Sequence, residues 1–243
     1  MAIDRIQMRS LGKLLLFILP VALAACIPAQ PYPTGVSLSQ PVSPPQVRAP
    51  KVGQQWVYNV RNVFNQEIVD VVTETVVSVG SQVVIARQGA KKGPLPDEIQ
   101  EPWGYILQDP HWNPPQKFLR PMPLWPLKLV VGWSGYYPNH YQVIGAPDFD
   151  YAWGLNIDVL RWERIKVPAG EFNTLLYRNE IPFFVSNDFS RIANVRSEEV
   201  WFSPEIGRWV IRRSAGRYLL SGMSGWAEAL SEDHLEWELV SWK

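Results

Sequence analysis

The sequence predicts a mainly β fold, an antiparallel half-barrel or sandwich-like sheet with a long Trp- and Pro-rich loop and little helix. Three observations support this prediction. Apolar and β-branched residues alternate with a period of two in several segments, as they do in strands with one buried face. Two short loops combine proline and glycine in the order that hairpins favour. No long segment shows the spacing of an amphipathic helix.

The first 25 residues have the three-part layout of a secretory signal. Arg5, Arg9 and Lys13 precede an apolar run, residues 14–25, that ends in small side chains. The run is much shorter than the roughly 20 residues that a membrane-spanning helix needs. We therefore expect residues 1–25 to be a signal peptide that is removed on export.

The end of this signal carries a resemblance to a known class of protein. Leu23-Ala24-Ala25-Cys26 resembles the bacterial lipobox, which implies cleavage before Cys26 and acyl chains on that cysteine. Cys26 is the only cysteine, which argues against an ordinary secretory signal with an incidental cysteine. Two or three chains would hold the protein on a membrane, since each buried methylene contributes about 0.8 kcal/mol. Ile27 stands where an Asp would imply retention in the inner membrane, so the resemblance implies the outer membrane, facing the periplasm.

The rest of the chain divides into a spacer and one domain. Residues 26–50 contain seven prolines and few bulky apolar groups, which predicts a Pro-rich tether without a packed core. Residues 51–243 are long enough for a single β-rich domain with its own core. Without the three basic and one acidic residues of the signal, 20 basic and 22 acidic residues remain. This near-neutral balance argues against nucleic acid, which binds clustered Lys and Arg.

The clearest strands follow the tether. Trp56, Tyr58, Val60 and Phe64 lie largely on one face of a period-two pattern. The next segment, residues 69–79, has β-branched side chains at every second position and acids between them. Gly80-Ser81 suits a tight turn that needs a positive φ, and residues 83–87 form the expected return strand.

Residues 89–126 break the pattern. They are rich in Pro, Lys, Asp and Trp, and we expect a long loop with one or two short strands, draped over the sheet. Strands resume at residues 155–167, 172–178, 195–202, 208–213 and 236–242. Only residues 227–232, and part of 186–194, favour a helical turn or two.

Two predicted hairpins carry a second resemblance. In Val167-Pro168-Ala169-Gly170 and in Ser203-Pro204-Glu205-Ile206-Gly207, proline presets φ and glycine can adopt a positive φ. These turns, together with the closing segment Trp237-Glu238-Leu239-Val240-Ser241-Trp242, look like a broad group of exported bacterial proteins of uncharacterised function. The group is similar in outline to antiparallel half-barrels, some of which hold acyl chains. The resemblance implies a fold and brings no catalytic residue with it.

The sequence indicates no cofactor, metal or catalytic site. Its three histidines, His111, His140 and His234, stand apart from one another, whereas metal sites need clustered ligands. Carboxylate pairs for glycan hydrolysis remain an alternative. The candidates, which we expect to be surface acids, are Asp148, Asp150, Glu198, Glu199 and Glu232. Glu198 and Glu199 should point to opposite faces of one strand and so cannot form a catalytic pair.

Tryptophan is the unusual feature of the composition, with 12 residues in the chain. Those in or near the loop-rich middle either pack in the core or form a ligand or partner surface. The candidate surface residues are Trp103, Trp112, Trp125 and Trp133. The preferred function is non-enzymatic binding of an envelope protein, a lipid or other apolar ligand, or a glycan. The rivals are a glycan-acting hydrolase and a purely structural subunit of an envelope complex.

Overall fold

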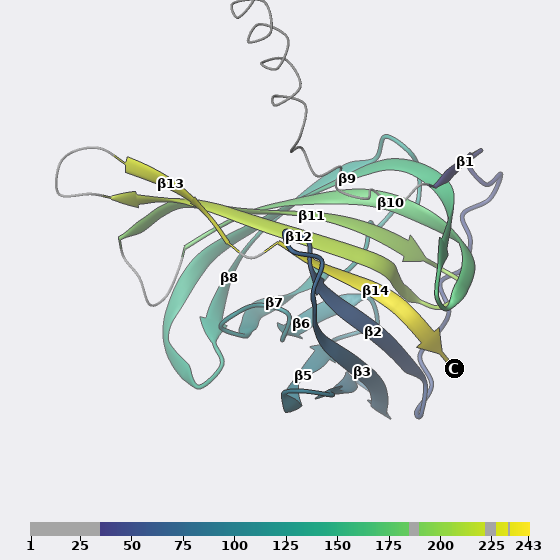
Figure 1. Ribbon diagram of the computed structural model, residues 1–243, viewed down its shortest axis with the longest axis horizontal. Helices are drawn as coiled ribbons and strands as arrows, with labels where there is room; N and C mark the ends of the chain where they lie inside the picture. The colour runs from purple at the N-terminus through teal and green to yellow at the C-terminus, as the bar shows by residue number, and fades with distance from the viewer. Residues whose placement is uncertain (1–34, 185–189, 222–226, 233) are drawn as a thin grey trace, which may run out of the picture. The chain divides into compact units, whose positions relative to one another are not determined.

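The computed structural model describes residues 35–184, 190–221, 227–232 and 234–243, and every regular element in these ranges is a β-strand (Figure 1). The strands are β1 (Val36–Leu38), β2 (Gln55–Asn62), β3 (Ile68–Val79), β4 (Val83–Gly89), β5 (Gly93–Gln100), β6 (Tyr105–Asp109), β7 (Gln116–Pro123), β8 (Ser134–Val143), β9 (Ala146–Val167), β10 (Gly170–Phe183), β11 (Arg191–Ser203), β12 (Arg208–Ser221), β13 (Ala227–Ser231) and β14 (Leu235–Trp242). Within the described ranges, no helix is long and apolar enough to span a membrane.

Twelve of these strands form a closed antiparallel ring. Their order is β9-β10-β11-β12-β14-β2-β3-β4-β5-β6-β7-β8, and β8 pairs with β9 again to complete the circle (Figure 1). Strand β1 pairs with β9, and β13 pairs with the far end of β12. The predicted mainly β, antiparallel class is confirmed. The sheet is closed, however, rather than a half-barrel or a sandwich.

The hairpins are where the sequence places them. Val167 pairs with Gly170 between β9 and β10, and Ser203 pairs with Arg208 between β11 and β12. Gly170 has φ 132° and Gly207 has φ 65°, so both adopt the positive φ that the turn chemistry requires. The β3–β4 hairpin is also present, but Gly80 is not among the residues with positive φ.

Valine at either of these two turn glycines should destabilise the domain, and by different amounts. A positive φ alone costs a β-branched residue about 1–2 kcal/mol. A Cβ at Gly170 would meet nothing closer than 3.9 Å, whereas one at Gly207 would lie 2.7 Å from the backbone oxygen of Arg48. We expect Gly207→Val to cost more unfolding free energy than Gly170→Val in urea denaturation. Equal costs would show that the contact with Arg48 is unimportant.

The segment 89–126 corrects the sequence interpretation. It is not a draped loop, because β5, β6 and β7 lie in the ring. Its strands are irregular: β5 and β6 share only two registered pairs, and β5 and β7 each contain prolines that cannot donate to a ladder. These features hide the period-two pattern. The helical expectation was wrong for residues 227–231, which form β13, and for residues 191–194, which belong to β11, while residues 186–189 lie outside the described residues.

Strand β3 turns its acidic face toward the interior. Asp70, Val72, Glu74 and Val76 are buried, whereas the β-branched residues between them face outward. Val77 and Val79 are 48% and 45% exposed. The interior of the ring therefore accepts carboxylates on a strand whose outward face is the more apolar one.

Residues 35–50, which we call the strap, pack against the ring instead of standing free as a tether. The strap begins with β1, and the backbone N–H of Val131 donates to Gln40 Oε1 at 2.8 Å. Further on, the N–H of Arg48 donates to Pro204 O at 2.9 Å, and Trp103 Nε1 donates to Arg48 O at 3.1 Å. This departs from the expected unpacked spacer. Cys26 and the rest of the expected signal lie outside the described residues.

Candidate functional site

The interior of the ring contains a network of charged side chains centred on Arg208. This arginine follows the β11–β12 turn, and its side chain is fully buried. Its Nη2 lies 2.6 Å from Glu74 Oε2 and 2.7 Å from Glu98 Oε2, and its Nη1 lies 2.7 Å from Glu98 Oε1. Arg87 Nε donates to the other Glu74 oxygen at 3.1 Å. The three strands β3, β5 and β12 are thus joined across the interior.

His111 extends this network to Asp109. Its Nε2 lies 3.0 Å from Glu74 Oε1 and its Nδ1 lies 2.9 Å from Asp109 Oδ1. Burial alone would raise the pKa values of Glu74 and Asp109, but the guanidinium of Arg208 and the hydrogen bonds of His111 hold the pKa of Glu74 well below its usual range. His111 and Arg212 do the same for the pKa of Asp109. Both carboxylates therefore act as hydrogen-bond acceptors in this network.

The network contains side chains of the types that bind metals, but their ligand atoms are already engaged in ion pairs. Oxygen and nitrogen atoms of Glu74, Glu98 and His111 lie within 4.8 Å of one another, although the sequence shows the histidines only as isolated residues. The guanidinium of Arg208 already binds both carboxylates and supplies the positive charge that a cation would supply. The arrangement is a saturated ion-pair network, and a cation could bind only if Arg208 moved away.

A second part of the interior surrounds a small cavity of about 30 Å³. Asp109 and Glu198 both line it, and Arg212 lies between them, with its Nη2 2.7 Å from Glu198 Oε1 and 3.8 Å from Asp109 Oδ2. Such a volume holds one or two water molecules. The other lining residues are mainly apolar and include Trp112, Trp153 and Trp209.

The candidate acids are distributed differently from the surface positions that we expected. Glu198 and Glu199 do point to opposite faces: Glu198 is buried beside Arg212, and Glu199 lies 3.3 Å from the exposed Arg178 on the outer face. Glu232 is half-buried and pairs with two arginines, Arg191 and Arg196. Asp150 is exposed, as expected, whereas the side chain of Asp148 lies outside the described part.

The buried acids predict acid sensitivity. The folded-state pKa values of Glu74 and Asp109 lie below their unfolded values of roughly 4. Their contribution to stability is therefore fully present above about pH 5 and is lost as the pH falls toward the folded-state values. We expect the urea midpoint to be clearly lower at pH 3 than at pH 5. An unchanged midpoint would contradict the assignment of these groups as ionised.

The four candidate tryptophans do not form one surface. Trp112 is inside the ring and 5% exposed, with its Nε1 3.1 Å from Asp109 Oδ2. Trp103 stacks on Trp56 at 6.5 Å and meets Trp125 edge-on at 5.5 Å, next to the strap. Trp133 is partly buried elsewhere against the core. The sequence shows that tryptophans are frequent in this region but not that their side chains face different ways.

A groove between the strap and the ring is a ligand-sized space with largely apolar walls. Its volume is about 460 Å³, within the range of small-molecule sites. The lining residues are Leu38, Ser39, Pro41, Pro45, Gln46, Trp162, Asn173, Pro204 and Glu205. The indole N–H of the buried Trp162 has no hydrogen-bond partner within the described protein. Two other hollows on the outer sheet, of about 300 and 500 Å³, are lined mostly by polar and charged side chains.

Comparisons with known proteins bear on the fold alone. No protein-family model and no curated protein matches the chain. The structure is similar to that of a candidate lipoprotein from Parabacteroides distasonis, with a TM-score of 0.53 and 12% identity over 79% of this chain and 96% of that one. A candidate exported protein with a YmcC-like fold from Bacteroides fragilis gives a TM-score of 0.49 at 12% identity over the same shares. At such identity, ligand and activity do not follow from the similarity.

Proposed function

We propose that this chain is a lipid-anchored protein of the cell envelope whose β-domain binds a ligand or partner without catalysing a reaction. The lipobox-like residues 23–26 support the anchor. The Parabacteroides protein of similar fold is itself described as a candidate lipoprotein, which supports the same assignment. The outer membrane, facing the periplasm, is the expected location.

The interior network is the observation that carries the non-enzymatic proposal. A general acid or a nucleophile must reach a substrate. Here Glu74, Glu98 and Glu198 each bind an arginine, and Asp109 binds His111. The cavity beside Asp109 and Glu198 has room for water only, so a sugar ring could not lie between these two acids. This geometry supports a scaffold role for the interior and disfavours the rival hydrolase.

Binding would then take place outside the ring, and the groove under the strap is our proposed site. Its walls of leucine, proline and tryptophan suit an apolar ligand or an extended peptide. Filling the groove should therefore displace the ligand without disturbing the interior.

The test of binding is a native purification followed by mass spectrometry of co-purifying lipids and proteins. Ser39 lines the groove, whereas the exposed Ser37 does not. We expect Ser39→Trp to lose the co-purifying species and Ser37→Trp, the matched control, to retain it. If both variants retain it, the groove is not the site. If nothing co-purifies specifically, the purely structural subunit becomes the better interpretation.

The anchor is tested separately. Cys26→Ser removes the thiol that would accept the acyl chains, and we expect the variant to leave the detergent phase and to lose palmitate labelling. A variant that still labels, or that stays on membranes after a carbonate wash, would show that Cys26 is not the anchor.

A further inference from the structure

The described part of the chain begins very close to the proposed anchor. Gly35 is nine positions after Cys26, and a fully extended chain advances at most about 3.6 Å per residue, or roughly 30 Å in all. A free tether of residues 26–50 would have allowed a far larger distance. Because the strap is bound to the ring, the surface around Gly35 must lie near the membrane if Cys26 is acylated. The inference therefore rests on the lipid anchor proposed above.

Two segments next to this point expose aliphatic side chains. Val36 and Val42 of the strap are 68% and 107% exposed, and Leu127 and Val131 of the loop before β8 are 52% and 41% exposed. We call these four residues the aliphatic rim. The hydrogen bond from Val131 N–H to Gln40 Oε1, at 2.8 Å, joins the two segments. Single exposed aliphatics are ordinary, but four on two joined segments form a surface feature.

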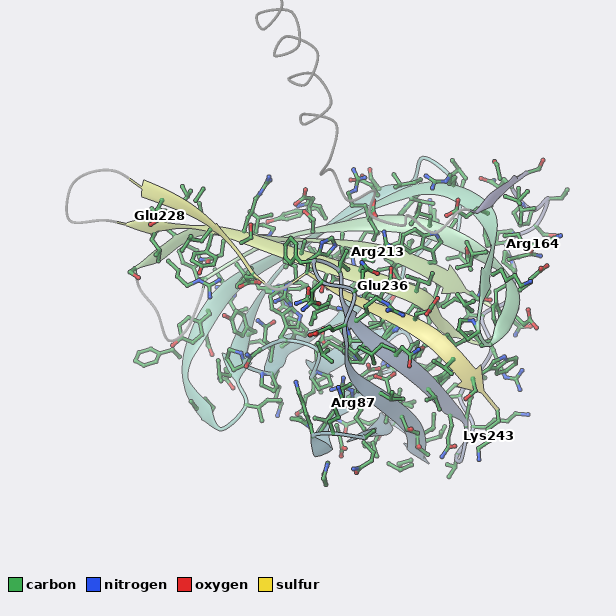
Figure 2. All side chains as sticks on the ribbon, viewed as in Figure 1. Arg87, Arg164, Arg213, Glu228, Glu236 and Lys243 are labelled. Atoms are coloured by element: carbon green, nitrogen blue, oxygen red, sulfur yellow. The ribbon has the colours of Figure 1, made fainter. Side chains whose placement is uncertain are left out.

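Basic residues flank the aliphatic rim. Val36 pairs with Arg164 on β9, and Figure 2 shows Arg164 beside β1. Arg161 and Lys166 lie on the same part of β9, and Lys128 follows Leu127. The nearby acids are Glu163, which is buried and binds Arg161, and Glu171, which pairs with Lys166 across the β9–β10 hairpin. Two further exposed acids lie close by: Glu205 lines the groove with Leu38 and Ser39, and Asp158 pairs with Ser134 at the start of β8. Basic and acidic side chains are therefore mixed here, and the aliphatic rim is what distinguishes this face.

The outer face of the neighbouring strands carries a regular row of paired charges. Cross-strand neighbours from β9 to β2 alternate strictly in sign, in the order Asp158, Arg178, Glu199, Arg213, Glu236 and Arg61. Figure 2 shows Arg213 next to Glu236 on this face. Opposite charges directly across a sheet neutralise one another. The face around β1 differs from this row of paired charges because it carries the aliphatic rim beside its basic residues.

We propose that the face formed by β1, the aliphatic rim and the flanking basic residues rests on an anionic phospholipid surface. Aliphatic side chains can insert by about 5–10 Å at the boundary between headgroups and acyl chains. Lys and Arg beside them can reach lipid phosphates, each contributing attraction near an anionic surface. The acyl chains on Cys26 hold the protein on the membrane, and this face sets its orientation there.

Single-cysteine labelling tests the proposal on the intact acylated protein. Because acylation consumes Cys26, the only native cysteine, an introduced cysteine is the only free thiol. Val42→Cys and Leu127→Cys report on the face, while Val79→Cys and Phe149→Cys are exposed controls on β3 and β9. Each variant is labelled with nitrobenzoxadiazole and reconstituted into vesicles of phosphatidylethanolamine and phosphatidylglycerol that contain nitroxide-labelled lipid. Labels at the first two positions should be quenched at least about twofold more than the controls, as interfacial insertion requires.

The outcomes separate this inference from the anchor. Mass spectrometry first establishes whether the protein carries acyl chains, and their absence would overturn the anchor and this inference together. With acyl chains present, equal quenching at all four positions, or stronger quenching at Phe149→Cys, overturns the membrane-facing surface alone. Shielding in cell envelopes but not in vesicles would assign the face to a protein partner instead. Arg164→Glu combined with Lys128→Glu should reduce quenching at Val42→Cys, and an unchanged signal would overturn the role of the basic residues.

Discussion

Replacing Arg208 with methionine is expected to remove about 3–5 kcal/mol of unfolding free energy, because it leaves buried carboxylates without their partner. Glu74 and Glu98 each bind this guanidinium, and all three side chains are fully buried. Methionine has a similar length but no charge. Urea denaturation followed by tryptophan fluorescence measures the loss.

Two controls show whether the loss comes from unpaired charge. Arg164→Met removes an exposed arginine of β9 whose guanidinium donates, within the described ranges, to Asn173 Oδ1, and it should change the free energy by less than about 0.5 kcal/mol. Adding Glu98→Gln to Arg208→Met should restore part of the loss, because Glu98 is then no longer a buried charge without its arginine, while Glu74 still binds Arg87. If the double variant is no more stable than Arg208→Met, shape rather than charge explains the effect.

Trp112→Ala is expected to have a similar effect, about 3–5 kcal/mol, because it opens a large cavity inside the ring. The indole contacts Phe183 and Trp153 at ring distances of 4.9 and 6.4 Å, and the guanidinium of Arg196 lies 3.8 Å from its centre. Trp133→Ala, at a partly buried site, should cost clearly less. Thermal denaturation tests this: the melting temperature of Trp112→Ala should fall further than that of Trp133→Ala.

Trp112→Phe separates the volume of the side chain from its hydrogen bond. Phenylalanine keeps most of the apolar area but cannot donate to Asp109 Oδ2. We expect a smaller cost of about 1–3 kcal/mol, that of leaving a buried acceptor without this donor. Losses as large as those of Trp112→Ala would show that the hydrogen bond, not packing, dominates at this position.

Local chemistry explains the parts of the fold that the sequence predicts well. Pro168 and Gly170, and Pro204 and Gly207, determine their turns through their own backbone preferences, so no distant residue is needed. The flanking strands are also predictable, because the turn residues and the period-two pattern beside them both indicate a hairpin. Strand β5, which contains Pro94, lies in the ring because β4 and β6 pair with it. This pairing does not produce a period-two pattern in the sequence of β5.

The interior network was not predictable for a related reason. Alternation on β3 shows which residues share a face, but it does not show which face is inside. Glu74 meets His111 and Arg208 only through the closed ring, and these residues are 37 and 134 positions away in the sequence. As charged or ionisable residues, Glu74, His111 and Arg208 would be expected on the surface. The position of Arg208 directly after a Pro-Gly turn does not identify the carboxylates that it binds.

The pairing of β14 with β2 has a consequence for how the chain acquires its structure. Trp242 lies opposite Trp56, so the ring joins two of the most distant parts of the domain in the sequence. A chain synthesised from its N-terminus cannot close the circle until the last strand has emerged, and such long-range pairing makes folding slow. Until then, β2 presents an unpaired edge that can join another chain. We therefore expect the chain to be more prone to aggregation before β14 pairs with β2 than after the ring has closed.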